Sequence, residues 1–265
     1  MEIKIGIAYH KDTPIISNDI YIPIHVGKAL NPSLDLHIQP DNEGDNISEE
    51  NGYYCELTAT YWLWKNVDSD YKGICHYRRV FSLHYSLFDV ISNCISFMRS
   101  RVYMPQKKYK DVKAYVQDAL RGSEKFKNIL NEYPIIAPKK IISMRTLYSH
   151  FVIIGDDYIN VLKDVVATKY PNVYGFVVSA LDAQSFYYAN MVIMRDDYFN
   201  EYCEFLFDIL ESVKEKMLSE KWILSTDELI FSRKLGYLAE ILTNTYLLMK
   251  ESDQVPIKKM VISFF

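Results

Sequence analysis

The stretch "YKGICHYRRV", residues 71–80, decides how the fold of this chain is interpreted. Its first five residues form a short run of the kind that makes a buried β-strand. One imidazole and two guanidinium groups follow at once, from His76, Arg78 and Arg79. In an open α/β sheet, ligands bind outside the carboxyl ends of the strands. We therefore predict a buried strand that ends in a ligand-binding group of cations.

The segments before this stretch predict two further strands and a helix. Residues 3–9, "IKIGIAY", are rich in β-branched side chains and predict a first strand, with His10 leaving its carboxyl end. A second short strand is predicted near residues 36–39, before the polar loop 41–46. Residues 51–66 predict a helix that is apolar on nearly every face and is therefore buried. If the first and third strands are parallel neighbours, this loop and His10 lie near the two arginines.

The remainder of the chain alternates helical and strand-like segments. Residues 86–132 are predicted to be helical and amphipathic. The further predicted elements are strands at 134–138 and 189–195 and helices at 146–151, 157–168, 196–220 and 225–250. Strands that alternate with helices indicate an α/β layer fold with a largely parallel sheet.

Composition limits the classes of function. The 265 residues include 30 basic and 34 acidic side chains, a net charge of -4, so the chain lacks the general basic surface of a nucleic-acid-binding protein. We expect no nucleic acid partner and an anion that is held locally. The four cysteines contain no C-x-x-C pair, which indicates neither a zinc site nor a disulfide framework. Reduced thiols indicate a cytoplasmic protein.

The sequence predicts a soluble protein, and one segment leaves membrane contact open. No signal peptide is evident, and no segment approaches the ~20 apolar residues that span a bilayer. Residues 258–265, "KKMVISFF", combine two lysines with apolar and aromatic groups. They can touch an anionic membrane surface, or they can form an edge strand, which is the interpretation we favour. Peripheral contact with the cytoplasmic face of the inner membrane stays open.

The two arginines allow a functional and a structural interpretation. A guanidinium group is always charged and presents a planar fork of donors that matches phosphate oxygens. Arg78 and Arg79, together with His76, can therefore bind a diphosphate and stabilise it as a leaving group. The structural alternative is that the arginines pair with Glu56, which lies in an otherwise apolar helix and needs a partner.

Acidic side chains offer a metal site, which we weigh against a turn. Asp68 and Asp70 lie one residue apart, and such a pair can hold Mg²⁺ or Mn²⁺ beside a nucleotide. The pair precedes the strand, however, and lies at the edge opposite the predicted pocket. Residues 66–71 therefore read better as a turn between helix and strand.

The last predicted helix carries two candidates for a catalytic carboxylate. Ser225 and Glu228 fit a capping box, which explains Glu228 without catalysis, whereas Asp227 is unexplained. Farther along, Glu240 lies on one polar stripe with Arg233, Gly236 and Tyr237. The stripe belongs either to the site or to the exposed surface of the helix.

Other polar groups near the predicted strands remain ambiguous. Tyr187, Tyr188 and Asn190 can orient a sugar ring, since an amide both donates and accepts hydrogen bonds, although core tyrosines are an equally good interpretation. His150 is either a general base or a structural histidine. The chain has no G-x-S-x-G, Walker or G-x-G-x-x-G motif, which argues against hydrolase, NTPase and dinucleotide-binding functions.

Four blocks of the chain resemble a known family, and they occur in the family's order. They read "DNEGDNISEENGYYCELTATYWLWKN" from residue 41, "DYKGICHYRRVF" from residue 70, "NMVIMRDDYFNEYCEFLFDIL" from residue 190 and "RKLGYLAEIL" from residue 233. The chain is similar to bacterial capsule and exopolysaccharide proteins that carry domain of unknown function 4422, some of which are galactosyl- or galactofuranosyltransferases. It departs from them in residues 82–132 and in "AEIL", where an arginine commonly follows the glutamate. These departures leave the choice of acceptor open.

The resemblance implies a sugar-nucleotide-dependent glycosyltransferase with a GT-A-like, Rossmann-type fold. We expect a single domain of residues 1–265 with a mostly parallel central sheet, flanking helices and a helical C-terminal part. Residues 1–80 would form the nucleotide-binding half and residues 133–265 the acceptor and catalytic half. The expected donor is a UDP-sugar that carries galactose or galactofuranose. The expected acceptor is a glycan or lipid-linked glycan in capsule, exopolysaccharide or O-antigen synthesis.

The resemblance also bears on whether the protein needs a metal ion. GT-A folds usually place a metal-binding D-x-D motif where residues 76–79, "HYRR", stand here. We expect these cations to replace the ion, so that no metal cofactor is needed; the alternative is Mn²⁺ or Mg²⁺.

The resulting assignment gives each candidate a role. His76, Arg78 and Arg79 bind the donor diphosphate, and either Asp227 or Glu240 deprotonates the acceptor hydroxyl, with inversion expected by analogy with the family. Residues that would hold the nucleoside and donor sugar are His10, Asp41, Asp45 and Asn46, and those that would contact the acceptor or sugar are Tyr187, Tyr188 and Asn190. The alternatives are a nucleotide-sugar or glycan-binding protein without chemistry, and a phosphosugar transferase that releases UMP.

Overall fold

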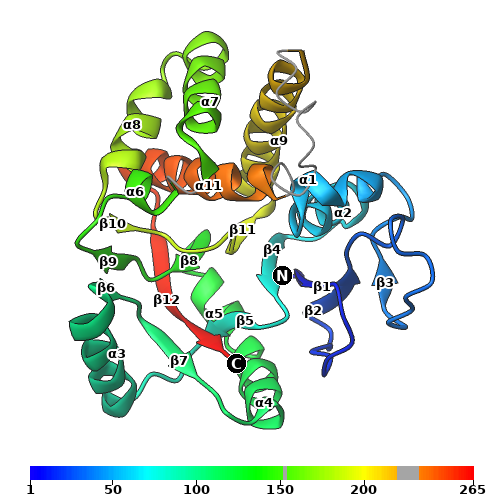
Figure 1. Ribbon diagram of the computed structural model, residues 1–265. Coiled ribbons are helices and arrows are strands. Elements are labelled where there is room, and N and C mark those ends of the chain that lie inside the picture. Colours follow the sequence, from blue (N-terminus) through cyan, green and yellow to red (C-terminus); the bar gives the residue numbers. More distant parts are fainter. Residues whose placement is uncertain (152–153, 220–232) are drawn as a thin grey trace.

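The computed structural model describes residues 1–151, 154–219 and 233–265 (Figure 1). Its helices are the 3₁₀ helix Ser48–Glu50, α1 Asn51–Tyr54, α2 Leu57–Asn66, α3 Leu87–Ser100, α4 Val112–Ser123, α5 Phe126–Leu130, α6 Leu147–Phe151, α7 Asp156–Lys169, α8 Tyr174–Asp182, α9 Asp196–Ser219 and α11 Lys234–Ser252. Its strands are β1 Ile3–Tyr9, β2 Tyr21–His25, β3 Gln39–Pro40, β4 Tyr71–His76, β5 Arg79–Ser82, β6 Val102–Tyr103, β7 Gln106–Lys108, β8 Ile135–Pro138, β9 Ile141–Ser143, β10 Ser185–Phe186, β11 Val192–Arg195 and β12 Ile257–Phe264.

The main sheet has a parallel part and a mixed part that meet at β4. Strands β3, β2, β1 and β4 lie side by side and all run parallel. On its other side β4 pairs antiparallel with both β5 and β11. Strand β12 pairs with β5 and β8, and β8 pairs with β11, so the pairing of these five strands closes on itself. The fold is a mixed α/β domain, and the expectation of a mostly parallel sheet is not confirmed.

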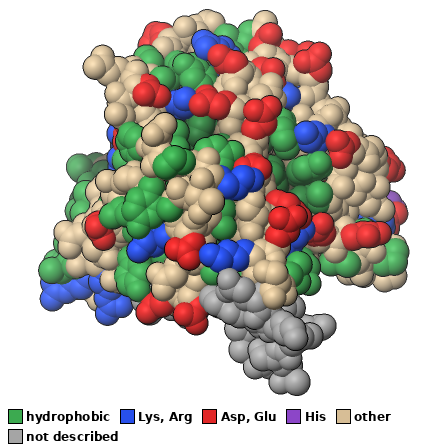
Figure 2. All heavy atoms as spheres, turned by 90° about the horizontal axis from the view of Figure 1, so that it is seen from above, with side chains coloured by type: hydrophobic (Ala, Val, Ile, Leu, Met, Phe, Trp, Pro, Cys, Tyr) green, Lys and Arg blue, Asp and Glu red, His purple; other side chains and the backbone are tan. Residues whose placement is uncertain are grey.

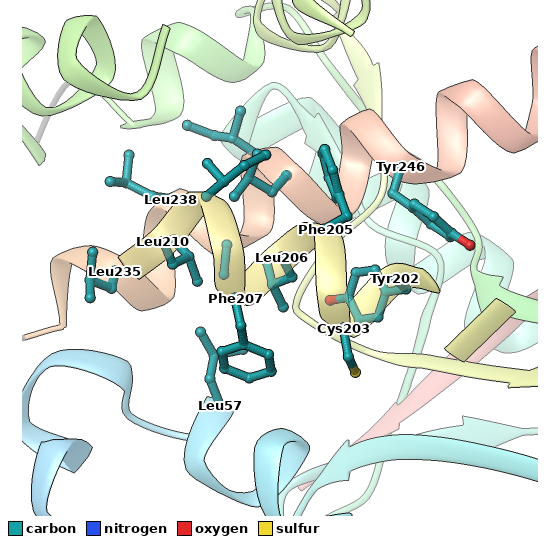
Figure 3. Packing of buried hydrophobic residues seen from close by; sticks show 14 of the residues in the cluster. Leu57, Tyr202, Cys203, Phe205, Leu206, Phe207, Leu210, Leu235, Leu238 and Tyr246 are labelled. Atoms are coloured by element: carbon teal, nitrogen blue, oxygen red, sulfur yellow. The ribbon is translucent and has the colours of Figure 1, made fainter. Parts of the chain in front are cut away.

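Alternating side chains place a hydrophobic core on each face of the sheet. Ile74 and Val192 face a core completed by α2, α7, α8, α9 and α11, whereas their neighbours Cys75 and Ile193 face a core completed by α4 and α5. This alternation is the period of two that a strand imposes on its side chains. In Figure 3, side chains of α9 and α11 pack together with Leu57 of α2. The outer face of these helices carries acidic and basic side chains intermixed (Figure 2).

The first and third predicted strands are confirmed as β1 and β4, and they are parallel neighbours. The prediction near residues 36–39 was wrong, because the second strand is Tyr21–His25 and only the two-residue β3 lies close to that segment. Pro23 inside β2 hid the strand, since proline cannot donate a hydrogen bond to a neighbour. The helix predicted at 51–66 is interrupted at Cys55, where φ is 51° and the chain leaves the helical region.

Two further predictions changed, one in the middle of the chain and one in the C-terminal part. The segment 86–132 contains α3, α4 and α5, as predicted, but it also contains strands β6 and β7. The tail forms β12 in the interior of the sheet, where Val261 and Ile262 are buried. It is therefore neither an edge strand nor free to lie on a membrane. The predicted start of the last helix falls in residues 220–232, outside the described residues.

The turn predicted before the third strand is confirmed. Helix α2 ends at Asn66 and β4 begins at Tyr71. Asp70 accepts a hydrogen bond from the Glu2 amide at 2.7 Å, and its carboxylate lies 3.4 Å from the terminal amino group. In the described part of the chain, no helix is long and apolar enough to cross a membrane.

Candidate active site

A cavity of about 830 Å³ opens at the carboxyl ends of β1 and β4. Helix α1 and the first turns of α11 form one wall, and the small antiparallel sheet β10-β9-β6 contributes another (Figure 1). The polar and charged side chains that line it are His10, Asn51, Glu56, His76, Tyr77, Arg78, Arg79, His150, Tyr188, Arg233, Tyr237 and Glu240. This is the edge at which open α/β sheets bind their ligands.

The cations of the opening stretch reach this cavity because the chain reverses there. Strand β4 ends at His76, which pairs with Arg79, the first residue of β5. The Tyr77 amide donates to the Ala8 carbonyl at 3.2 Å, which fixes the turn against β1. A short reversal between two strands therefore presents the imidazole and both guanidinium groups at one edge of the sheet.

Neither arginine forms an ion pair with any carboxylate among the residues that the structure describes. The guanidinium carbon of Arg79 lies 4.9 Å from the ring centre of Tyr188, and that of Arg78 lies 5.3 Å from the ring centre of Tyr77. Glu56, the partner that the structural alternative requires, instead accepts a hydrogen bond from Asn190 at 3.1 Å. Aromatic rings thus hold the two guanidinium groups in place and leave their donors available to an anion.

His76 lies at the base of this group, and its surroundings lower its pKa. Burial lowers its pKa, the charge of Glu56 opposes the shift, and the positive charges of Arg79 and Arg78 lower it further. Its Nε2 atom is buried without a hydrogen-bond partner in the structure. A buried ring nitrogen without a partner is costly, so this atom is suited to a hydrogen bond with a ligand.

Glu240 is the carboxylate that faces the arginines. It projects from α11 and accepts a hydrogen bond from the Ala189 amide at 3.2 Å. Burial and the nearby charge of Glu56 raise its pKa to about 7, while the Ala189 amide and Arg79 oppose the rise. A carboxylate with a pKa near neutrality can take a proton from a hydroxyl group and later release it.

The segment that carries Ala189 is tied firmly to α11. Asn244 accepts a hydrogen bond from the Tyr187 amide at 2.7 Å and donates one to the Tyr187 carbonyl at 2.9 Å. Ala189 itself has φ at 64°, in the left-handed region that a non-glycine residue seldom occupies. Asn190 donates to the Gly236 carbonyl at 3.1 Å. These contacts direct the Ala189 amide at Glu240.

Of the three residues expected to contact acceptor or sugar, one lines the cavity. Tyr188 is partly buried beside Arg79. Tyr187 is buried, and its hydroxyl donates to Glu251 at 2.8 Å. Asn190 is buried among Glu56 and α11. Tyr187 and Asn190 are therefore supports of the cavity wall, because their polar atoms are already engaged within the protein.

The loop 41–46 lies away from the cavity, contrary to expectation. Asp41 is fully buried and accepts hydrogen bonds from the Gly27 and Lys28 amides and from the hydroxyls of Ser48 and Thr58.

The two other candidates in this loop are likewise engaged. Asp45 accepts from the Tyr61 hydroxyl at 3.2 Å, and Asn46 donates to the Gly44 carbonyl at 2.8 Å. None of the three lines the cavity. Of the residues expected to hold the nucleoside and sugar, the structure brings His10 alone to this edge.

The polar stripe on the last helix belongs to the cavity. Gly236 is buried and packs against the break between α1 and α2, where a Cβ atom would lie 3.9 Å from the sulfur of Cys55, in ordinary van der Waals contact. The Arg233 amide donates to the Gly52 carbonyl at 3.1 Å. Arg233 and Tyr237 are exposed while they line the cavity, so the stripe belongs both to the helix surface and to the site. Asp227, the other carboxylate candidate, lies outside the described residues.

The model of a family described as domain of unknown function 4422 (DUF4422) matches residues 4–251, which include the whole cavity lining. This chain belongs to the DUF4422 family. A solved structure described as the apo structure of WbbM, a bifunctional glycosyltransferase, superposes with a TM-score of 0.80 at 27% sequence identity. A search of curated proteins found no match.

The structural match extends over only part of the WbbM chain. It covers 100% of this chain but 45% of the WbbM chain, so this chain spans less than half of that protein. The membership in the DUF4422 family confirms the resemblance drawn from the four sequence blocks. It does not show which sugar is transferred.

Three cavity residues of this DUF4422 chain were not assigned a role from the sequence. Glu56 was considered only as a partner for the arginines, yet its charge acts to raise the pKa of both His76 and Glu240. Arg233 and Tyr237 were visible only as part of the helical stripe. The positive φ at Cys55 marks this region as a candidate site, but it is visible only in the structure, so the sequence held no comparable signal for these residues.

The structure also places His150 and the pair Asp68 and Asp70, which the sequence offered as a general base and as metal ligands. His150 lines the cavity, and its Nε2 atom lies 2.8 Å from the Ser143 hydroxyl. Asp68 and Asp70 lie at the opposite end of β4, in the turn described above. Among the described residues, no three His, Cys, Asp or Glu side chains come together in a way that could hold a metal ion.

Proposed function

We propose that this chain transfers a glycosyl group from a nucleoside diphosphate sugar to a hydroxyl acceptor. One observation carries the proposal: Arg78 and Arg79, which lack acidic partners among the described residues, share a cavity with Glu240, whose pKa is raised to about 7. Such a transfer needs cations that stabilise the leaving diphosphate and a base whose pKa lies near 7. The similarity to a bifunctional glycosyltransferase supports the same class of reaction.

The cationic side of the cavity would hold the departing diphosphate. Arg78 and Arg79 offer forked donors to its oxygens, and His76 offers the otherwise unsatisfied Nε2 atom. As the bond between the anomeric carbon and the phosphate oxygen breaks, negative charge grows on that oxygen. Fixed positive charges in a partly enclosed cavity stabilise this charge more than they would in water.

Glu240 would act on the acceptor. Its carboxylate takes the proton of the acceptor hydroxyl as the oxygen attacks the anomeric carbon, and the nucleoside diphosphate leaves from the opposite side. Such a single displacement inverts the configuration of that carbon. Asp227, the second candidate from the sequence, remains an alternative base.

A narrower form of the proposal concerns the sugar and its destination. We propose UDP-galactose or UDP-galactofuranose as donor and a glycan or lipid-linked glycan as acceptor, in capsule, exopolysaccharide or O-antigen synthesis at the cytoplasmic side of the membrane. Tyr188 offers an aromatic face to a sugar or base beside Arg79, and His10 lies at the same edge. We also propose that the arginines remove the need for a metal ion.

A non-catalytic binding protein is the second candidate. The arginines and Tyr188 would suit it equally well. Glu240 favours the enzyme, because a carboxylate buried beside Glu56 is costly and contributes nothing to holding an anionic ligand.

Product analysis separates these functions. The purified chain is incubated with UDP-sugars and candidate glycan acceptors, and the nucleotide products are resolved by chromatography. Acceptor-dependent release of UDP is the expected result. Release of UMP would indicate phosphosugar transfer, and tight donor binding without any nucleotide release would indicate the binding protein.

A further inference from the structure

Helix α3 exposes apolar side chains along its outer face. Leu87 is 75% exposed, Phe88 77% and Met98 66%, and Ile91 and Ile95 are exposed as well. At 3.6 residues per turn these five side chains fall within an arc of about 100° and extend over about 16 Å of helix. Figure 1 shows α3 at the periphery of the fold, away from the layers of α7, α8, α9 and α11.

The inner face of α3 is held by a polar contact, so the helix is fixed with this apolar arc outward. Asn93 is buried and donates to the Gln106 carbonyl and to the Tyr85 hydroxyl, both at 2.8 Å. A capping box of Ser86 and Asp89 defines the first turn. A helix of a globular protein usually turns its apolar stripe toward the core. Here the most exposed large apolar side chains point away from it.

The apolar area continues beyond the helix. Strand β9 pairs with β6, which follows α3 directly, and it exposes Ile142 by 52%. Met144, exposed by 61%, donates its amide to the carbonyl of Arg101, the residue that ends α3. We name the seven side chains of this area the α3 patch: Leu87, Phe88, Ile91, Ile95, Met98, Ile142 and Met144.

The charge around the α3 patch is positive, although the chain as a whole is acidic. Residues 87–110 contain five basic and one acidic side chain, a net charge of +4, while the whole chain has -4. The five basic residues are Arg99, Arg101, Lys107, Lys108 and Lys110, of which Lys107 lies 4.0 Å from the carboxylate of Asp118 in α4. The single acid, Asp89, is engaged in the capping box. In the described residues, Arg99 and Arg101 form no ion pair, and both are exposed.

We propose that the α3 patch docks the protein on an anionic lipid bilayer. An interfacial helix buries an apolar arc among acyl chains while basic residues meet anionic headgroups. The α3 patch combines both features, whereas an exposed apolar area of this extent is unusual on a monomer that has no partner. This assignment replaces the tail as the membrane contact, because the tail is strand β12.

The position of the α3 patch gives the docking a consequence for the cavity. Val102 and Met104, which follow α3 within four residues, line the cavity. A docked α3 therefore brings the cavity near the headgroups, where a lipid-linked acceptor would be found. This consequence rests on the proposed function, but the docking itself does not.

Flotation with lipid vesicles tests the docking. The full chain is mixed with phosphatidylcholine vesicles, either pure or with about one-third phosphatidylglycerol. We expect it to float with the anionic vesicles and not with the neutral ones. The double variant Phe88→Ser, Met98→Ser should lower the partition coefficient about tenfold or more, because each side chain would lose its burial among acyl chains. The double variant Arg99→Gln, Arg101→Gln should lower it about fivefold for each charge.

A matched control replaces equally apolar surface elsewhere. Leu30→Ser combined with Leu218→Ser removes side chains that are 56% and 48% exposed outside the α3 patch, and should leave flotation unchanged. Circular dichroism verifies that every variant is folded. Transfer to a soluble acceptor should be unchanged in Phe88→Ser, Met98→Ser, so failure of the proposed enzyme activity is read separately from failure of the docking.

Three results would overturn the proposal. The first is that the wild-type protein floats with neither the anionic nor the neutral vesicles at low salt. The second is equal loss of flotation in the control and in Phe88→Ser, Met98→Ser. The third is a dimer, measured by light scattering, that Phe88→Ser, Met98→Ser dissociates, since the α3 patch would then be covered by a second copy of the chain.

Discussion

Two regions of the molecule surround a carboxylate differently: Asp41 is fully buried, and Glu240 is partly buried at the wall of the cavity. Around Asp41, two backbone amides and two hydroxyls donate hydrogen bonds to the carboxylate oxygens. Around Glu240, one backbone amide donates, and the negative charge of Glu56 lies nearby. The first group is fully satisfied as an anion, whereas the second is poised between its charged and neutral forms.

The difference separates a structural acid from a chemical one. The donors of the first region tie the loop 41–46 to β2 and to the start of α2, and they leave no acceptor capacity for a ligand. The second region keeps a carboxylate that can exchange a proton beside two arginines, and this arrangement lowers the stability of the folded protein. The distinction between Asp41 and Glu240 can be tested by substitution, by pH and by chelation.

Replacing the chemical acid should have the largest effect. Glu240→Gln keeps an acceptor for the Ala189 amide but cannot take a proton, so we expect the turnover number to fall about 10²–10⁴-fold with donor binding retained. Turnover is measured as acceptor-dependent release of nucleotide. Glu251→Gln, at a glutamate on the same helix that pairs with Lys140 and Lys259, should keep its turnover. If Glu240→Gln lowers stability but not turnover, then Glu240 is a structural acid like Asp41 and not the base of the reaction.

Removing a guanidinium group beside Glu240 should be the next largest change. Arg79→Gln loses a forked cation that would face the departing diphosphate, and we expect kcat/KM to fall about 10²–10³-fold. The matched control is Arg195→Gln, because Arg195 is an exposed arginine already paired with Asp197. Steady-state kinetics with varied donor measure both. Equal effects in the two variants would remove the arginine site from the proposal.

Replacing the structural acid should affect stability alone. Asp41→Asn turns an amide group toward donors and leaves at least one buried donor without a partner, which costs about 1–3 kcal/mol in free energy of unfolding. Urea denaturation measures this change, and the rate of transfer per folded molecule should stay at the wild-type value. A large fall in that rate would return Asp41 to the list of donor-binding residues.

The pH dependence of activity should follow Glu240. Because the base must be deprotonated and its pKa is about 7, kcat/KM should rise about tenfold per pH unit below that value and level off above it.

Stability should change in the opposite direction. The folded state keeps its proton up to about 7, whereas an ordinary glutamate releases it at 4.5. Between these values the folded state binds more protons, so this group makes the protein less stable as pH rises. Glu240→Gln should flatten both profiles in this window, and a retained acid limb of activity would assign the base elsewhere.

Chelation should have the smallest effect. If guanidinium groups stand in for a metal ion, transfer measured in excess EDTA should equal transfer in its absence. Full loss of activity with EDTA, restored by Mn²⁺, would contradict the metal-free form of the proposal and leave the glycosyl transfer itself intact.

The sequence predicted those parts of the fold and site that depend on neighbouring residues. Strands β1 and β4 were predicted from short apolar runs, and His76, Arg78 and Arg79 were placed at the cavity because they directly follow such a run. The resemblance to the DUF4422 family could likewise be drawn from contiguous blocks.

The sequence could not predict what depends on contacts between distant segments. Nothing in the sequence alone marks Asp41 as a structural acid and Glu240 as a chemical one, and only Gly27, Ser48 and Thr58 brought together in space make Asp41 structural. The mixed part of the sheet was missed for the same reason, since β12 finds its partners far along the chain. The exposed arc of α3 also required the structure, because periodicity shows a stripe but not the side on which it lies.

The closed pairing of five strands has a consequence for how the molecule folds. Arg79 pairs with Phe264, about two-thirds of the chain length away in the sequence, and β5 has its longer ladder with β12. Contacts of such high contact order form slowly, because a very long loop must close before they contribute. The guanidinium group that faces the phosphates in our proposal therefore reaches its place through a slow, nonlocal event. A nascent or partly unfolded chain would hold β4 and β1 together while its anion site was still incomplete.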